Sequence, residues 1–113
     1  APFHCALMAP AADAMSGVLG DVPLRLPTVP VVANVSAAPV EDPSEIRKLL
    51  VEQVTSRVRW RESILKMKEL GVDTFVEVGA GRALTGMIRR IDQNLVRYSV
   101  QSADDIVEFI ASI

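Results

Sequence analysis

The sequence predicts an α/β fold in which helices cover a mostly parallel sheet. Short, apolar, β-branched runs alternate along the chain with longer segments of helical periodicity, an order that is typical of parallel sheets. Half of the 113 residues are hydrophobic and the mean hydropathy is +0.28, so the chain is too apolar to remain disordered. Its mass of 12.2 kDa is that of one domain, which buries about two-thirds of its unfolded surface.

A helix and then a strand are predicted in the first 35 residues. The helix has an apolar stripe made of Met8, Ala12, Met15 and Leu19. It ends near Gly20, and the proline-rich stretch 23–30 then interrupts helical structure. The following run VVANV at 31–35 is short and apolar, which predicts a buried strand over these five residues.

Two further helices are predicted from their end signals. Asp42 suits the N-cap of the first, Pro43 its first helical position, and Glu45 completes a capping-box pattern. The apolar face of this helix consists of Ile46, Leu49 and Leu50. The next helix begins near Trp60 and ends at Gly71, which stands in a C-cap position.

The remaining residues predict two strands, each followed by a helix. The first strand covers 74–78, and the turn at 79–81 leads into a helix with Leu84, Met87, Ile88 and Ile91 on its apolar face. The second strand covers 97–100. Ser102 and Asp105 then cap a final helix, whose apolar residues are Ile106, Phe109, Ile110 and Ile113.

Composition excludes several classes of function. Fourteen acidic and twelve basic residues give a formal charge of −2, which does not indicate a nucleic-acid-binding protein. No apolar run approaches the roughly 18 residues that a membrane span needs. Cys5 is the only cysteine and His4 the only histidine, so neither an intrachain disulfide nor a metal site is predicted. We expect a cytoplasmic protein that binds no metal or cofactor.

Few residues are candidates for catalysis. His4 is the only candidate general base, although its position alone favours an idle histidine near a terminus. Cys5 is interpreted as an inert thiol, because adjacent side chains point apart. Gln53 completes the apolar stripe of its helix near the helix end. It is therefore either a satisfied core glutamine or the source of a main-chain carbonyl that orients another side chain.

The turn Gly79-Ala80-Gly81 invites a phosphate-binding hypothesis, because helix N-termini bind anions. The third glycine of a dinucleotide-binding motif would stand at Leu84, however, so a tight strand-to-helix turn is favoured. The same helix carries Arg82, Arg89 and Arg90. This basic surface is either solvated or open to an acidic partner or a CoA phosphate.

Four segments, taken together, resemble a known family. They are FHCALM at 3–8, VVANV at 31–35, VRW at 58–60, and EVGAG at 77–81 with LTG at 84–86. Their order and spacing are similar to the C-terminal part of the malonyl-CoA:acyl carrier protein transacylases, and the resemblance spans the whole chain. It implies an α/β-hydrolase-like large subdomain with an inserted ferredoxin-like subdomain.

On this resemblance, residues 1–113 are the C-terminal segment of a single acyltransferase domain. The upstream part, which carries the serine nucleophile, and the ferredoxin-like subdomain are absent. The family moves malonyl from CoA to the phosphopantetheine thiol of acyl carrier protein by a Ser/His ping-pong mechanism in fatty acid biosynthesis. Because the chain has no Gly-x-Ser-x-Gly motif, it is expected to be inactive without the upstream part of its domain.

The resemblance also implies roles for three residues. His4 matches the catalytic histidine of the family, and Gln53 aligns with the residue whose main-chain carbonyl orients that histidine. Phe3 directly precedes His4, where related domains carry phenylalanine when they use malonyl rather than methylmalonyl. Two alternatives stay open: a fragment of a polyketide synthase acyltransferase domain, and a non-catalytic α/β module that binds CoA or a protein partner through residues 79–90.

Overall fold

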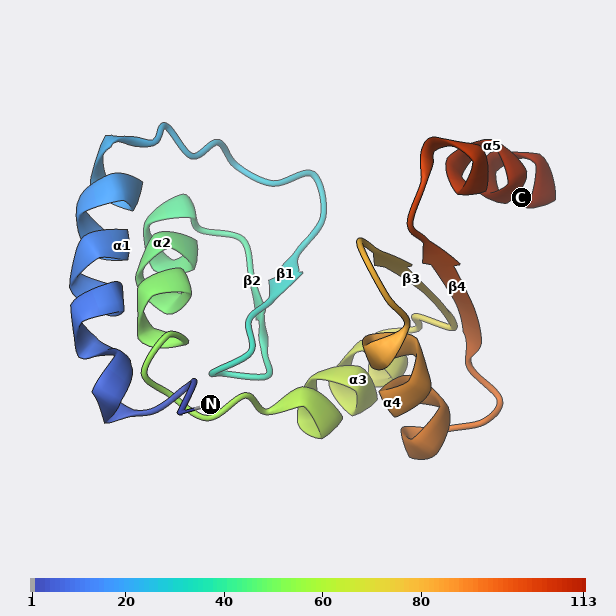
Figure 1. Ribbon diagram of the computed structural model, residues 1–113, viewed down its shortest axis with the longest axis horizontal. Coiled ribbons are helices and arrows are strands. Elements are labelled where there is room, and N and C mark those ends of the chain that lie inside the picture. The colour runs from blue at the N-terminus through green and yellow to red at the C-terminus, as the bar shows by residue number, and fades with distance from the viewer. Residues whose placement is uncertain (1) are drawn as a thin grey trace. The chain divides into compact units, whose positions relative to one another are not determined.

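The computed structural model describes residues 2–113 and confirms the α/β fold class (Figure 1). Its helices are α1 (Ala9–Asp21), α2 (Pro43–Glu52), α3 (Trp60–Glu69), α4 (Ala83–Ile91) and α5 (Ala103–Ser112). Its strands are β1 (Val31–Val32), β2 (Pro39–Val40), β3 (Thr74–Val78) and β4 (Val96–Val100). Within the described part of the chain, no helix is long and apolar enough to cross a membrane.

The chain divides into two compact units, Ala1–Lys66 and Met67–Ile113, which we call the N-terminal and C-terminal units. In the N-terminal unit α1 packs against α2, as the blue and green helices of Figure 1 show. The buried apolar residues of the two helices are Ala12 of α1 and Ile46 and Leu49 of α2. Their burial agrees with the apolar stripes of the two predicted helices.

Helix α2 has the N-cap and the first-turn proline that its sequence predicts, whereas the capping box predicted with Glu45 is not formed. The Asp42 carboxylate accepts a hydrogen bond from the Glu45 N–H at 2.9 Å, and Pro43 occupies the first turn. The Glu45 carboxylate pairs with Lys48 at 3.5 Å, so it serves an ion pair within the helix. The Ser44 hydroxyl, and then the Glu45 N–H, hold the pKa of Asp42 below its ordinary value.

The prediction of a strand over 31–35 is wrong, because the strand is shorter than these five residues. Only Val31–Val32 is a strand, and it pairs antiparallel with Pro39–Val40 rather than within a parallel sheet. Residues 33–37 form a tight turn, which the Ala37 N–H closes by donating to the Ala33 carbonyl at 2.9 Å. Ala37 has a φ of +52°. The apolar, β-branched pattern misled the prediction because this turn is held by Arg59, which lies 22 residues beyond it.

Helix α3 ends at the glycine that the sequence indicates. Gly71 has a φ of +94°, a conformation that glycine adopts without strain. Its N–H donates to the Lys68 carbonyl at 3.0 Å, and the Val72 N–H donates to the Met67 carbonyl at 3.0 Å. These two bonds form a Schellman motif, which satisfies carbonyls that the helix end leaves without partners.

In the C-terminal unit, β3 and β4 form a parallel pair joined by α4. The register runs from Thr74 opposite Val96 to Val78 opposite Val100. Helix α4 contacts both strands and α5 contacts β4 (Figure 1), where the Tyr98 and Phe109 rings meet edge to face at 5.0 Å. The predicted capping box of α5 is confirmed, because Ser102 and Asp105 exchange both of its hydrogen bonds.

Candidate active site

The His4 ring is held by a main-chain group far away in the sequence. Its Nδ1 lies 2.7 Å from the carbonyl oxygen of Gln53. A carbonyl oxygen only accepts hydrogen bonds, so Nδ1 carries the proton and donates it. In the neutral ring, the other nitrogen, Nε2, then has the lone pair and can accept a proton from a nucleophile.

The backbone at His4 has an uncommon conformation. Its φ is +54°, in the left-handed region that few residues other than glycine adopt. Such conformations are concentrated at functional sites, where the surrounding structure enforces them. A 3-10 turn, Ala6–Met8, follows directly, and the Met8 N–H donates to the Cys5 carbonyl at 2.9 Å. This turn fixes the chain immediately after the histidine.

Gln53 offers its carbonyl because α2 ends there. It is the C-cap of the helix, and its own N–H donates to the Leu49 carbonyl at 3.0 Å. The carbonyls of a last helical turn have no partner four residues ahead. The Ser56 N–H is the main-chain donor that reaches the Gln53 oxygen, at a long 3.4 Å. The oxygen therefore has the capacity to accept the His4 N–H.

The Gln53 side chain is also bonded. The Asn34 Nδ2 donates to the Gln53 Oε1 at 2.8 Å, and the contact is partly buried. The sequence left open whether Gln53 is a satisfied glutamine or the source of an orienting carbonyl. The structure contains both contacts at once.

Phe3 and His4 line the same pocket. Its volume is about 210 Å³, and its walls are Phe3, His4, Met8, Gln53 and Val54. The Phe3 side chain is 64% exposed, so it borders the pocket without being packed into a core. The half-buried Cys5 thiol donates to the Pro2 carbonyl at 3.2 Å. Among the described residues, no cluster of three or more histidine, cysteine, aspartate or glutamate side chains suits a metal ion.

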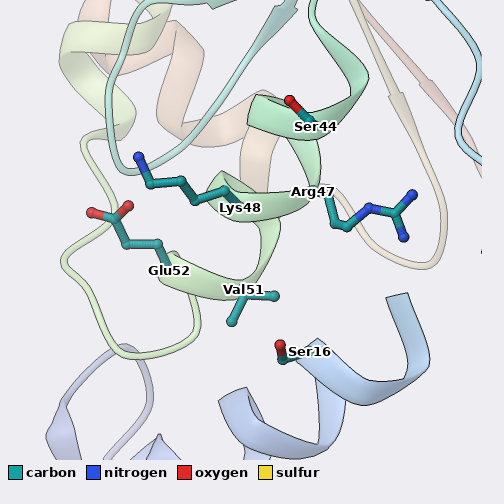
Figure 2. A pocket seen from close by; sticks show the side chains of 6 residues that line it. All are labelled: Ser16, Ser44, Arg47, Lys48, Val51 and Glu52. Atoms are coloured by element: carbon teal, nitrogen blue, oxygen red, sulfur yellow. The ribbon is translucent and has the colours of Figure 1, made fainter. Parts of the chain in front are cut away.

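A larger hollow of about 400 Å³ lies beside α2, with Ser16 of α1 at its border (Figure 2). Figure 2 shows Arg47 and Lys48 pointing to opposite sides of α2, while Val51 points toward Ser16. Arg47 donates to the Val22 carbonyl at 3.0 Å, and Lys48 pairs with Glu45 at 3.5 Å. The two cations therefore do not converge on one ligand position.

The N-terminus of α4, where a phosphate was considered, is occupied by a carboxylate of the chain itself. Glu77 on β3 accepts hydrogen bonds from the Leu84 N–H at 3.1 Å and the Thr85 N–H at 2.7 Å. The Thr85 hydroxyl also donates to it at 2.5 Å. That hydroxyl, and then the helix N–H groups, hold the pKa of Glu77 below its ordinary value. The phosphate-binding hypothesis is therefore disfavoured.

The preferred interpretation of residues 79–81 as a tight turn agrees with the structure. Gly79 has a φ of +135° and Gly81 a φ of +97°, so both use conformations that side chains disfavour. The Gly79 N–H donates to the Val100 carbonyl at 3.0 Å, and the Gly81 N–H donates to the Gln101 Oε1 at 2.9 Å. The turn is thus bonded to the end of β4.

No protein-family model matches the chain. The malonyl CoA-acyl carrier protein transacylase of Bacillus subtilis is 38% identical over 105 residues, which are 93% of this chain and 33% of that protein. The solved acyl-carrier-protein-S-malonyltransferase of Bartonella henselae is 47% identical, with a TM-score of 0.89 over 99% of this chain and 36% of that one. The chain is a homologue of the C-terminal part of the malonyl CoA-acyl carrier protein transacylases.

A third solved neighbour is also similar over almost the whole chain. It is a malonyl-transacylase solved in complex with a type II polyketide acyl-carrier protein, 37% identical with a TM-score of 0.86 over 99% of this chain. The chain spans about a third of the length of the curated transacylases that it matches. The family resemblance is thereby confirmed. The catalytic, orienting and selectivity roles assigned to His4, Gln53 and Phe3 stay predictions.

Proposed function

We propose that this chain supplies the general base of a malonyl-CoA:acyl carrier protein transacylase, with His4 as that base. The observation that carries the proposal is the 2.7 Å contact between the His4 Nδ1 and the Gln53 carbonyl. It fixes the ring tautomer that leaves Nε2 as a proton acceptor, which is the arrangement that Ser/His catalysis needs. The serine nucleophile comes from the upstream part of the domain, so this chain alone is inactive.

The reaction has two half-reactions. In the first, His4 Nε2 takes the proton of the serine hydroxyl, the serine oxygen bonds to the malonyl carbonyl carbon, and the CoA sulfur leaves with that proton. In the second, Nε2 takes the proton of the phosphopantetheine thiol, whose sulfur attacks the malonyl ester. The serine oxygen then leaves and recovers its proton. His4 is unchanged after both steps, as a ping-pong mechanism requires.

A neutral carbonyl suits this substrate as the partner of the base. The malonyl group carries a free carboxylate, and a second carboxylate beside the histidine would repel it in a closed site of low dielectric. The Gln53 carbonyl fixes the ring without adding a charge. No metal or cofactor takes part in the proposed mechanism, and malonyl-CoA is the substrate.

Phe3 is proposed to favour malonyl over methylmalonyl. Its ring borders the pocket that His4 lines, where an α-methyl group of the acyl chain would need space. Acyl carrier protein is the proposed acceptor. Fatty acid biosynthesis in the cytoplasm is the proposed setting. A carrier protein of polyketide synthesis is the second candidate, because a solved neighbour is in complex with one.

The test uses a chimeric enzyme, in which this chain replaces the matching part of the Bartonella henselae protein. We call this chimera the joined enzyme. His4→Ala is expected to lower malonyl transfer from CoA to carrier protein by about 10³-fold or more, because proton transfer is lost in both half-reactions. Cys5→Ala is the matched control at the adjacent position, and it should leave the rate unchanged. Transfer at the unsubstituted rate in the folded His4→Ala enzyme would contradict the proposal.

A binding experiment distinguishes the transacylase proposal from the non-catalytic alternative. That alternative expects this chain, without any upstream polypeptide, to bind CoA or carrier protein. Isothermal titration of the isolated chain with each of the two measures this directly. Binding by the isolated chain, together with an inactive joined enzyme, would favour the non-catalytic module.

A further inference from the structure

We propose that Asn34 is a positioning residue, which fixes the Gln53 carbonyl and through it the His4 ring. The inference rests on the proposed role of His4 as the base. It concerns a residue that touches neither the histidine nor its pocket. Asn34 lines a separate, mostly apolar hollow of about 240 Å³ between β1 and α2, and Gln53 lines both that hollow and the pocket of His4.

Two consecutive hydrogen bonds carry the effect. The Asn34 Nδ2 donates to the Gln53 Oε1 at 2.8 Å, and the Gln53 carbonyl accepts from the His4 Nδ1 at 2.7 Å. Both bonds use one residue, the first through its side chain and the second through its main chain. A rotation of Gln53 at the helix end therefore moves its carbonyl oxygen, which orients the His4 ring.

The helix end needs this support, because its own hydrogen bonds weaken there. After the 3.0 Å bond from the Gln53 N–H, the next three N–H groups make turn-like bonds that lengthen from 3.1 through 3.3 to 3.4 Å. A helix whose last hydrogen bonds are turn-like and long tends to fray at that end. The partly buried bond from Asn34 anchors the Gln53 side chain where the main chain is held least.

Asn34 is itself held rigidly. Its carbonyl accepts from the Arg59 N–H at 2.8 Å, and the Arg59 guanidinium donates to the Ser36 carbonyl at 2.9 Å. Arg59 is held in turn by the Ser63 hydroxyl, which donates to its carbonyl at 2.8 Å and belongs to a side chain only 2% exposed. The turn at 33–37 is thus a fixed point for Gln53, and this explains why its sequence does not form a strand.

The geometry predicts an effect on the turnover rate rather than on binding. A base that is displaced by about 1 Å loses roughly 10²-fold in rate, because proton transfer depends steeply on position. Asn34 lies outside the pocket of His4, so its substitution removes no contact to the substrate. Loss of the Asn34–Gln53 bond should therefore lower kcat and leave the KM for malonyl-CoA unchanged.

Substitutions of Asn34 alone test the bond in the joined enzyme. In Asn34→Asp the Gln53 amide turns and donates to the new carboxylate, so one hydrogen bond is kept and kcat should stay within about fivefold. Asn34→Leu removes the donor and adds no charge, so its kcat should fall by about 10²-fold.

A spectroscopic readout separates positioning from general weakening of the fold. The ¹⁵N shifts of the His4 ring report which nitrogen carries the proton. They should indicate the Nδ1–H form in the unsubstituted enzyme and in Asn34→Asp, and a mixture of tautomers in Asn34→Leu. Asn94→Asp makes the same exchange at an exposed position of the C-terminal unit and serves as the control.

Each outcome decides the inference. An Asn34→Asp enzyme as slow as Asn34→Leu, or a raised KM with unchanged kcat, would overturn it. If Asn34→Leu does not fold, Asn34→Ala replaces it, because alanine also removes the donor and adds no charge. A folded Asn34→Leu or Asn34→Ala enzyme with unchanged kcat and ring tautomer also overturns the inference. If His4→Ala is inactive while the Asn34 variants keep an unchanged kcat, the proposed function stands and only the role of Asn34 fails.

Discussion

The two units of the molecule are organised by contacts of very different reach. In the C-terminal unit, the groups that define helix ends lie within eight residues of one another, as in the Schellman motif at Gly71 and the capping box of Ser102 and Asp105. In the N-terminal unit, the decisive contact joins His4 to Gln53 across 49 residues. Short-range contacts define a scaffold locally, whereas the candidate site exists only after distant segments have come together.

The chemistry of the contacts differs as well. Carboxylates close the helix N-termini of the C-terminal unit, and the pKa values of Glu77 and Asp105 are both lowered by the groups that donate to them. The chain of bonds at His4 instead uses an imidazole, a main-chain carbonyl and two amides. Charge is placed where it stabilises helix ends, and neutral groups stand beside the candidate base.

The sharpest test of this contrast is a core substitution in the C-terminal unit. Ile88 of α4 is 4% exposed, so Ile88→Ala should lower the free energy of unfolding of the joined enzyme by about 2–5 kcal/mol. The kcat per folded molecule should not change. Chemical denaturation and a steady-state assay measure the two quantities.

Val107→Ala is the control for that experiment, because its side chain is 68% exposed and the change should cost less than about 0.5 kcal/mol. A lowered kcat in fully folded Ile88→Ala would show that the C-terminal unit takes part in catalysis. The division between scaffold and site would then be wrong.

Phe3→Ser provides the converse case, a change in selectivity without a change in stability. Removal of the ring opens space beside His4, so methylmalonyl transfer should rise about tenfold relative to malonyl transfer. Because the side chain is 64% exposed, the unfolding midpoint should stay constant. Leu7→Ser, at a side chain 75% exposed and outside the pocket, is the matched control. If the ratio of methylmalonyl to malonyl transfer does not change, Phe3 has no role in selectivity and is an ordinary surface residue.

The same contrast explains what the sequence could predict. The structure has four features that follow from signals within a few residues. They are the N-cap of α2, the capping box of α5, the end of α3 at Gly71 and the strand Thr74–Val78. The strand over 31–35 failed because Arg59 holds part of it as a turn. No local pattern marks a contact of that range.

The candidate site shows the limit more clearly. Periodicity placed Gln53 at a helix end and left two roles open, and only the family resemblance connected it with His4. The bond from Asn34 was not predicted at all, because an asparagine within an apolar run carries no sign of its partner. Glu77 lies in one of the four segments that carry the family resemblance, but its contact with α4 was not predicted. The contact spans a glycine turn, which known capping patterns do not include.

The smallest expected effect concerns that carboxylate. The folded protein lowers the pKa of Glu77 below its ordinary value of 4.5, chiefly through the Thr85 hydroxyl. A lowered pKa means that the ionised form is stabilised by folding, so this contribution is complete above pH 4.5 and is lost as the pH falls through the lowered value. Glu77→Gln should therefore lower the unfolding midpoint at pH 7 and flatten its decline below pH 4.5.

Thermal unfolding of the joined enzyme between pH 7 and pH 3 measures this, with Glu108→Gln at an exposed position of α5 as the control for lost charge. The two substitutions remove the same charge, but only one removes it from a helix N-terminus. Equal curves would mean that Glu77 acts through net charge alone. A curve that flattens in Glu108→Gln instead would place the pH-sensitive group away from the N-terminus of α4. The expected result is that the unfolding midpoint declines less steeply with falling pH in Glu77→Gln only. This result would locate the pH-sensitive group at the contact between Glu77 and Thr85, which spans eight residues.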